Sequence, residues 1–119
     1  MKINSLHCPV TNALTVLGGK WKINIIFLLS NKTMRFGAIK NTLQGITQQM
    51  LSKQLKELEI DGLVNREVKQ VMPPKVEYSL TSFGTSLIPI LKSLSNWNDK
   101  NSKLINLKLN KSFDESRIR

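Results

Sequence analysis

The chain has 119 residues, of which 18 are Lys or Arg and 8 are Asp or Glu, so its formal net charge is +10. This length suits one domain with one hydrophobic core, and the charge favours a polyanionic partner, either nucleic acid or an anionic membrane surface. Because the sequence shows no apolar run long enough to cross a bilayer and no secretory signal, we expect a cytoplasmic protein. With a single cysteine, Cys8, and a single histidine, His7, we expect no internal disulfide framework, no metal site and no cofactor.

Up to Lys56 the chain carries basic residues without any acid. Eight of them precede Glu57 and no Asp or Glu does, whereas all eight acids lie from Glu57 onward. This asymmetry predicts a positive surface on the first half of the fold. Charge by itself indicates only non-specific attraction, and a solvated lysine-rich surface would give the same asymmetry.

Two helices are predicted in the first thirty residues. Thr11 is the predicted N-cap of the first, which ends at the pair Gly18-Gly19. The second runs from about Lys20 to Ser30, and its apolar face includes Trp21, Ile25, Leu28 and Leu29. We interpret Trp21 as a core residue because its neighbours continue the same stripe.

A short helix is predicted over 36–43 and a longer one over 47–61. In the longer helix Leu51, Leu55 and Leu58 share one face, Thr47 is the predicted N-cap, and Gly62 follows the C-cap. The opposite face carries no acid in its first turns, and its members are Gln49, Ser52, Lys53 and Lys56. Since the helix dipole favours acids near the N-terminus, this order suggests an anionic partner there.

After Gly62 the apolar period changes to that of strands. Strands are predicted over 63–70 and 76–80, with a loop over 71–75 because Pro73 and Pro74 cannot supply backbone N–H groups. A helix-turn-helix followed by such a hairpin predicts an α+β, mostly α, fold: a winged helix-turn-helix with a two-stranded β-hairpin wing.

A last helix is predicted to begin at Thr81, with a kink or break at Pro89. The tail over 98–119 either continues this helix or frays, and we expect 1–119 to form a single domain. The apolar stripe of the last helix either completes a monomer's core or makes it a C-terminal dimerisation helix. We favour a dimer across the last and first helices, with the interface residues Leu14, Leu87, Leu91, Leu94 and Trp97.

Several motifs stand in the order and spacing of a known family. They are Cys8-Pro9-Val10, Gly18-Gly19-Lys20-Trp21, Arg35-Phe36, Gly45-Ile46-Thr47, the segments 51–58 and 73–81, and Asp61-Gly62-Leu63-Val64. Over about residues 8–97 the chain resembles the HxlR family of bacterial transcription regulators, relatives of MarR. The resemblance implies a homodimer that binds operator DNA as a repressor or activator and has no enzymatic activity.

The resemblance also implies which elements contact DNA. The helix over 47–61 enters the major groove, and the hairpin around 71–75 reaches the neighbouring backbone or minor groove. Amide and hydroxyl side chains suit base edges, which gives Gln48, Gln49 and Ser52. Cations suit phosphates, which gives Arg35, Lys53, Lys56, Lys69 and Lys75. With Thr47 at the helix start, these residues form the predicted DNA-binding set.

Cys8 has a second predicted role. Some members of the family sense electrophiles or oxidants through a cysteine just before the first helix, and Cys8 matches that position. Because the sequence has no second cysteine, a disulfide would have to form between subunits or with a small thiol, and the alternative is alkylation. The neighbouring His7, a helix N-terminus and the absence of nearby acids all favour the thiolate, whereas the commonest role of such a residue is an inert buried thiol.

Two other function classes remain as alternatives. The chain would be an interaction module if the winged helix bound protein and its charge served only solubility. An enzyme is disfavoured, because His7 and Cys8 lack an evident orienting partner and the sequence shows no phosphate loop or paired carboxylates.

Overall fold

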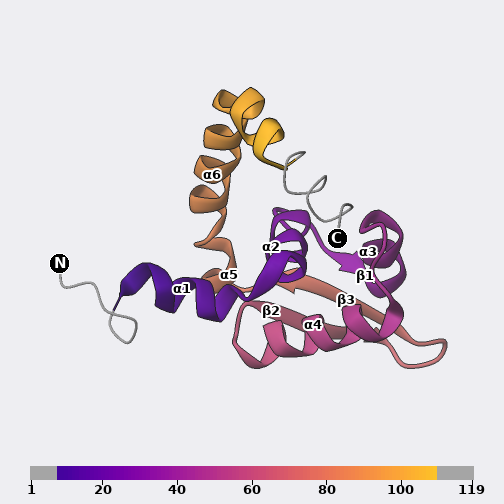
Figure 1. Ribbon diagram of the computed structural model, residues 1–119. Coiled ribbons are helices and arrows are strands. Elements are labelled where there is room, and N and C mark those ends of the chain that lie inside the picture. Colours follow the sequence, from indigo (N-terminus) through magenta and orange to yellow (C-terminus); the bar gives the residue numbers. More distant parts are fainter. Residues whose placement is uncertain (1–7, 110–119) are drawn as a thin grey trace. The chain divides into compact units, whose positions relative to one another are not determined.

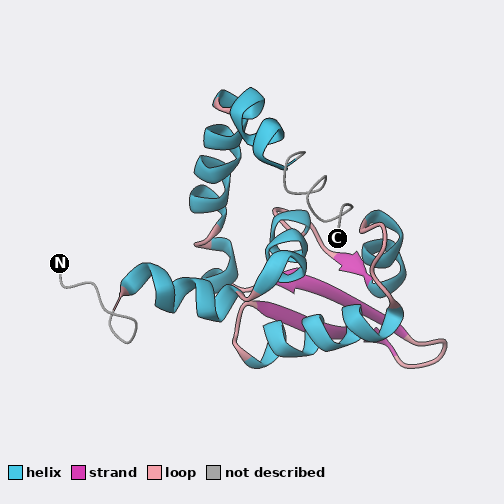
Figure 2. Ribbon diagram, viewed as in Figure 1, coloured by secondary structure: helices cyan, strands magenta, loops and turns pink. Residues whose placement is uncertain are grey.

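The computed structural model describes residues 8–109, which divide into two compact units between Ile88 and Pro89. The first unit holds, in order, α1 (Pro9–Leu17), α2 (Gly19–Leu28), β1 (Met34–Arg35), α3 (Phe36–Thr42), α4 (Gln48–Ile60), β2 (Val64–Gln70), β3 (Lys75–Leu80) and α5 (Ser82–Thr85). The second unit takes over within α6 (Ile88–Lys100), and residues 102–109 are also helical. Figure 1 labels the elements, and Figure 2 distinguishes the helices from the small sheet. A single domain over 1–119 stays a prediction.

The core of the first unit lies where α4 packs on α2 and β2. The three leucines predicted to face inward, Leu51, Leu55 and Leu58, are buried, which confirms the apolar stripe of this helix. From α2, Ile25 and Ile26 are fully buried, and Trp21 is half-buried. The outer face of α4 is therefore fixed by the burial of its inner one.

Both ends of α4 are closed by the predicted capping groups. The Thr47 hydroxyl accepts a hydrogen bond from the Met50 N–H at 3.1 Å. At the other end Gly62 has a φ of 77°, and its N–H donates to the Glu59 carbonyl at 3.1 Å. The Leu63 N–H donates to the Leu58 carbonyl at 2.9 Å, which completes a Schellman ending. This tight turn sends β2 back along α4.

The sheet has three antiparallel strands in the order β1-β3-β2, one strand more than the predicted hairpin. The extra strand, β1, has two residues and places Met34 opposite Tyr78 and Arg35 opposite Glu77. It pairs with β3 on the side away from β2, so β3 becomes the central strand. In Figure 1 the loop joining β2 and β3 projects toward the end of the unit at which α4 begins.

The predicted start of the first helix is wrong. Helix α1 begins at Pro9, and Cys8 rather than Thr11 occupies the N-cap position. Proline suits the first helical turn because its N–H would have no helical partner there and its φ is already helical. Helix α2 likewise begins at Gly19, one residue earlier than predicted, and ends at Leu28, two residues earlier.

The predicted break near Pro89 is confirmed, although it precedes the proline. Thr81 caps α5 by accepting the Gly84 N–H at 3.0 Å, and this helix ends at Thr85. Pro89 then occupies the first turn of α6, where its missing N–H leaves no helical bond unmade. Residues 110–119 lie outside the described residues. No helix in the described part of the chain is both long and apolar enough to cross a membrane.

Candidate nucleic-acid interface

The outer face of α4 presents all the side chains predicted to meet DNA on this helix. Those exposed to solvent are Thr47, Gln48, Gln49, Ser52, Lys53 and Lys56. Thr47 uses its hydroxyl oxygen to cap the helix, so it contributes first to the geometry of α4. The first turn contains no acid, and the helix dipole therefore adds to the positive potential of Lys53 and Lys56.

An ion pair that the sequence did not reveal ties α4 to α2. The Lys22 Nζ lies 2.9 Å from the Glu57 Oε2, with the lysine side chain 12% exposed and the glutamate 39%. The hydrogen bond from Lys22 lowers the pKa of Glu57, and the positive charges of Lys22 and Lys53 add to this effect. One of the early basic residues is thus committed to the fold and is not free for an anionic partner.

The cations of the sheet have different environments. Lys69 lies 3.1 Å from a carboxylate oxygen of Glu67 and 3.9 Å from one of Glu77, so nearby acids partly offset its charge. Arg35 is exposed on β1, and Lys75 is half-buried at the start of β3. The hairpin tip between the strands is apolar and open, with Val71 and Met72 being 78% and 84% exposed. The wing therefore carries less free positive charge than its composition implied.

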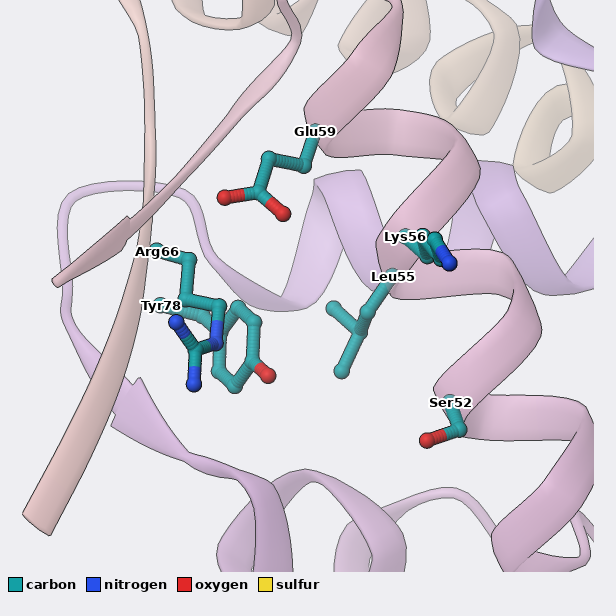
Figure 3. A pocket seen from close by; sticks show the side chains of 6 residues that line it. All are labelled: Ser52, Leu55, Lys56, Glu59, Arg66 and Tyr78. Carbon is teal, nitrogen blue, oxygen red and sulfur yellow. The ribbon is translucent and has the colours of Figure 1, made fainter. Parts of the chain in front are cut away.

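A groove of about 300 Å³ lies between α4 and the strands β2 and β3. Three of its lining residues, Ser52, Lys56 and Glu59, recur at helical spacing along the exposed edge of α4 that borders the sheet. Arg66 and Tyr78 line the other wall, and they are directly opposite each other in the β2–β3 register. Figure 3 shows Glu59, Leu55 and Ser52 pointing from α4 toward Arg66 and Tyr78, whereas Lys56 is seen nearly end-on. Sequence reasoning missed Glu59, Arg66 and Tyr78, because only the strand register brings them beside α4.

Cys8 is partly exposed at the N-cap of α1. The Thr11 hydroxyl, followed by the backbone N–H groups of Thr11 and Val10, lowers the pKa of the Cys8 thiol, because these donors stabilise the thiolate. The helix N-terminus expected beside Cys8 is present, one residue away. His7, the other group expected to favour the thiolate, lies outside the described residues.

The residues predicted for a dimer interface differ in their exposure. Leu14 on α1 and Leu94 and Trp97 on α6 are exposed, whereas Leu87 is half-buried and Leu91 is 4% exposed. An exposed tryptophan and leucine on one helix are an apolar surface of the kind that a partner covers. Their contact with a second subunit stays a prediction.

Comparison with known proteins identifies the family. The family model described as HxlR-like helix-turn-helix matches residues 16–106. The uncharacterized HTH-type transcriptional regulator YybR of Bacillus subtilis (strain 168) is 44% identical over 102 residues, which cover 86% of this chain and 82% of YybR. Among solved structures, the redox regulator HypR in its reduced form has a TM-score of 0.79 at 43% identity, covering 83% of this chain and 98% of HypR. The reduced form of the transcriptional regulator YodB from B. subtilis has a TM-score of 0.69 at 38% identity, covering 78% of this chain and 92% of YodB. The motifs noted in the sequence and the fold agree with these matches: the chain belongs to the HxlR-like helix-turn-helix family of transcriptional regulators.

Proposed function

We propose that this chain is a homodimeric regulator that binds operator DNA with α4 in the major groove. The observation that carries the proposal is the two-sided character of α4. Its leucines are buried while its amide, hydroxyl and ammonium side chains are exposed, with no acid in the first turn. An outward face of hydrogen-bonding and cationic groups matches the base edges and phosphates of a DNA groove.

The residues of the DNA-binding set divide into two roles. Gln48, Gln49 and Ser52 read base edges, because amides pair bidentately with adenine and a hydroxyl can donate or accept. The second group contacts phosphates and so positions the protein without reading sequence, and it consists of Arg35, Lys53, Lys56, Lys69 and Lys75. Thr47 supports both groups by holding the first turn of α4.

The dimer is proposed because operators are read by pairs of such helices. Two recognition helices about 34 Å apart would reach half-sites one DNA turn apart. The residues proposed for the contact are apolar residues of α1 and of the α5–α6 segment, namely Leu14, Leu87, Leu91, Leu94 and Trp97, of which Leu91 is buried and can only support the others. The exposure of Leu14, Leu94 and Trp97 supports this assignment.

Cys8 is proposed as the switch of DNA binding. The lowered pKa of its thiol and its partial exposure support a reactive thiolate, and HypR, a structural neighbour, is a redox regulator. With one cysteine per chain, the modification is an S-alkyl adduct with an electrophile, or a disulfide with a small thiol or with a second subunit. Modification releases DNA only if the modified form has a lower DNA affinity than the reduced form.

The experiment that tests the function is a salt titration of binding to the protein's own promoter fragment. We expect the logarithm of the affinity to fall linearly and steeply with the logarithm of the salt concentration, because phosphate contacts release counterions. Gln49→Ala should reduce discrimination between operator variants, whereas Lys53→Ala should weaken binding to all DNA alike. Binding that is indifferent to salt would refute the proposed mechanism.

The thiol switch has its own test. Wild-type protein and Cys8→Ser protein are treated with a quinone or a peroxide before the promoter shift. We expect the wild type to lose the promoter and the Cys8→Ser protein to keep it. Release from both proteins would assign the effect to another residue and remove Cys8 from the mechanism.

A further inference from the structure

The groove beside α4 contains two cations that no described acid neutralises. Lys22 and Lys69 are held in ion pairs, but Lys56 and Arg66 have no carboxylate within 4.0 Å among residues 8–109. Among the same described residues, the hydroxyl groups of Ser52 and Tyr78 make no hydrogen bond. The groove thus brings two cations without an ion-pair partner and two unengaged hydroxyl groups together between α4 and the strands.

These groups reach the groove from two different elements. Ser52 and Lys56 come from the side of α4 next to its outward face, and Arg66 and Tyr78 come from β2 and β3. In Figure 3 the Arg66 and Tyr78 side chains extend from the strands toward α4, and the Ser52 hydroxyl faces them across the open space. Two cations on opposite walls suit an anion that lies between the walls.

We propose that this groove seats one phosphate of the operator backbone, with Arg66 and Lys56 as its cations and the Tyr78 hydroxyl as a neutral donor. The assignment rests on the proposed function. If α4 lies in the major groove and the β2–β3 loop lies at the neighbouring minor groove, the DNA strand that separates the two grooves passes between α4 and the wing. The groove occupies that position.

Glu59 adds a negative charge to the proposed phosphate site. Its carboxylate lines the same groove, and at this position it repels a phosphate. The phosphate therefore lies toward Ser52 and Lys56, nearer the start of α4, and Glu59 sets the far limit of the seat. Removal of the Glu59 charge should strengthen DNA binding, which is the opposite of the effect expected at Arg66.

The first experiment compares wild-type protein with Arg66→Gln on promoter fragments that carry a single neutral methylphosphonate at successive backbone positions. We expect Arg66→Gln to weaken binding to unmodified DNA roughly tenfold or more. The slope of log affinity against log salt should become shallower by about 0.9 for each subunit's lost contact. Neutralising one backbone position in each half-site should weaken the wild type more than it weakens Arg66→Gln, because the variant has already lost one of the contacts to that phosphate.

Three further variants complete the design. Arg66→Lys should restore the salt slope because it keeps the charge, and Glu59→Gln should bind more tightly than wild type. Lys92→Gln is the matched control: it removes one positive charge from an exposed position on α6 and should leave the backbone profile unchanged. Circular dichroism of each variant would show that all of them retain the wild-type fold.

The results separate this inference from the proposed function. If Arg66→Gln keeps the wild-type slope and the same sensitive phosphates while wild-type binding remains salt-dependent, the groove does not seat a phosphate although the protein binds DNA. An Arg66→Gln protein that binds DNA normally but no longer responds to a small organic anion would assign the groove to that ligand and overturn the proposal. Wild-type protein that does not bind DNA would end both proposals together.

Discussion

Helices α4 and α6 each have 13 residues and each carry three large apolar side chains at positions i, i+4 and i+7. On α4 these are Leu51, Leu55 and Leu58, which are 0%, 2% and 0% exposed. On α6 they are Ile90, Leu94 and Trp97, which are 57%, 57% and 60% exposed. The same spacing therefore gives a buried stripe in one helix and an open one in the other. Periodicity indicates which residues share a face, and the rest of the fold decides whether that face is covered.

The different exposure of the two apolar stripes bears on what each helix can do. The stripe of α4 is covered by its own unit, so the helix is held rigidly with its polar side outward, as a DNA-reading element requires. The stripe of α6 is left for another surface, and we assign that surface to a second subunit. Burial thus separates a helix whose apolar stripe is covered by its own unit from one whose Ile90, Leu94 and Trp97 are exposed.

The largest expected difference between the two helices is in stability. Leu58→Ala should lower the free energy of unfolding by about 2–5 kcal/mol, because it leaves a cavity in the core. Leu94→Ala should change it by no more than about 0.5 kcal/mol when the protein is dilute enough to be monomeric. Urea unfolding followed by circular dichroism gives both values. Equal losses in the two variants would mean that the Leu94 side chain is also covered within the monomer.

Self-association should show the reverse order. Trp97→Ala should raise the dissociation constant of the proposed dimer roughly thirtyfold or more, because buried tryptophans are among the strongest contributors to interfaces. Lys92→Ala, at an exposed position of the same helix, is the control and should change it little. Sedimentation equilibrium over a range of concentrations measures the constant. A wild-type protein that stays monomeric at micromolar concentration would refute the dimer.

A smaller effect on stability is expected at Gly84, which lies in α5 against the turn that ends α4. A Cβ built at this glycine would collide with the Leu63 carbonyl, which belongs to the turn that ends α4. Gly84→Ala should therefore lower the free energy of unfolding by about 1–3 kcal/mol, since the backbone must shift to make room. Gly37→Ala is the control, because nothing lies within 4 Å of the corresponding Cβ. Similar thermal midpoints for the two variants would contradict this account.

Features that depend on residues close together in the sequence were predicted correctly, apart from some helix ends, and features that depend on distant residues were not. The caps of α4 were predictable because Thr47 and Gly62 act on residues a few positions away. The short strand β1 was not, because two residues show no alternation and its existence depends on pairing with β3. The start of α1 differs from the prediction because the proline signal at Pro9 outweighs the capping preference of Thr11.

The part of the candidate site that lies on α4 could be predicted from the sequence, and the part formed by contacts between distant residues could not. The outward residues of α4 follow from helical geometry once its leucines are placed in the core, and the structure exposes them as expected. The groove required the register that sets Arg66 opposite Tyr78 and brings both beside α4. The Lys22–Glu57 pair required the packing of α2 on α4. Each missed feature joins residues that are distant in sequence, and the spacing of neighbours carries no signal for such contacts.

The smallest expected effect concerns this Lys22–Glu57 pair, which fixes α4 on the side away from the groove. The folded state lowers the pKa of Glu57, chiefly through the hydrogen bond from Lys22, so the unfolded chain binds a proton at this carboxyl more readily than the folded one. The resulting stability is present above the ordinary glutamate pKa and is lost as the pH falls through the lowered folded value. Glu57→Gln should therefore be less stable than wild type near neutral pH, and the difference should shrink on acidification through that range. Unfolding free energies of both proteins from about pH 7 to about pH 3 test this sign. A difference that stays constant with pH would show that the pair holds α4 by packing and not by charge. Helix α6 has no ion pair within the described residues, so no such pH-dependent contribution to stability is expected from it.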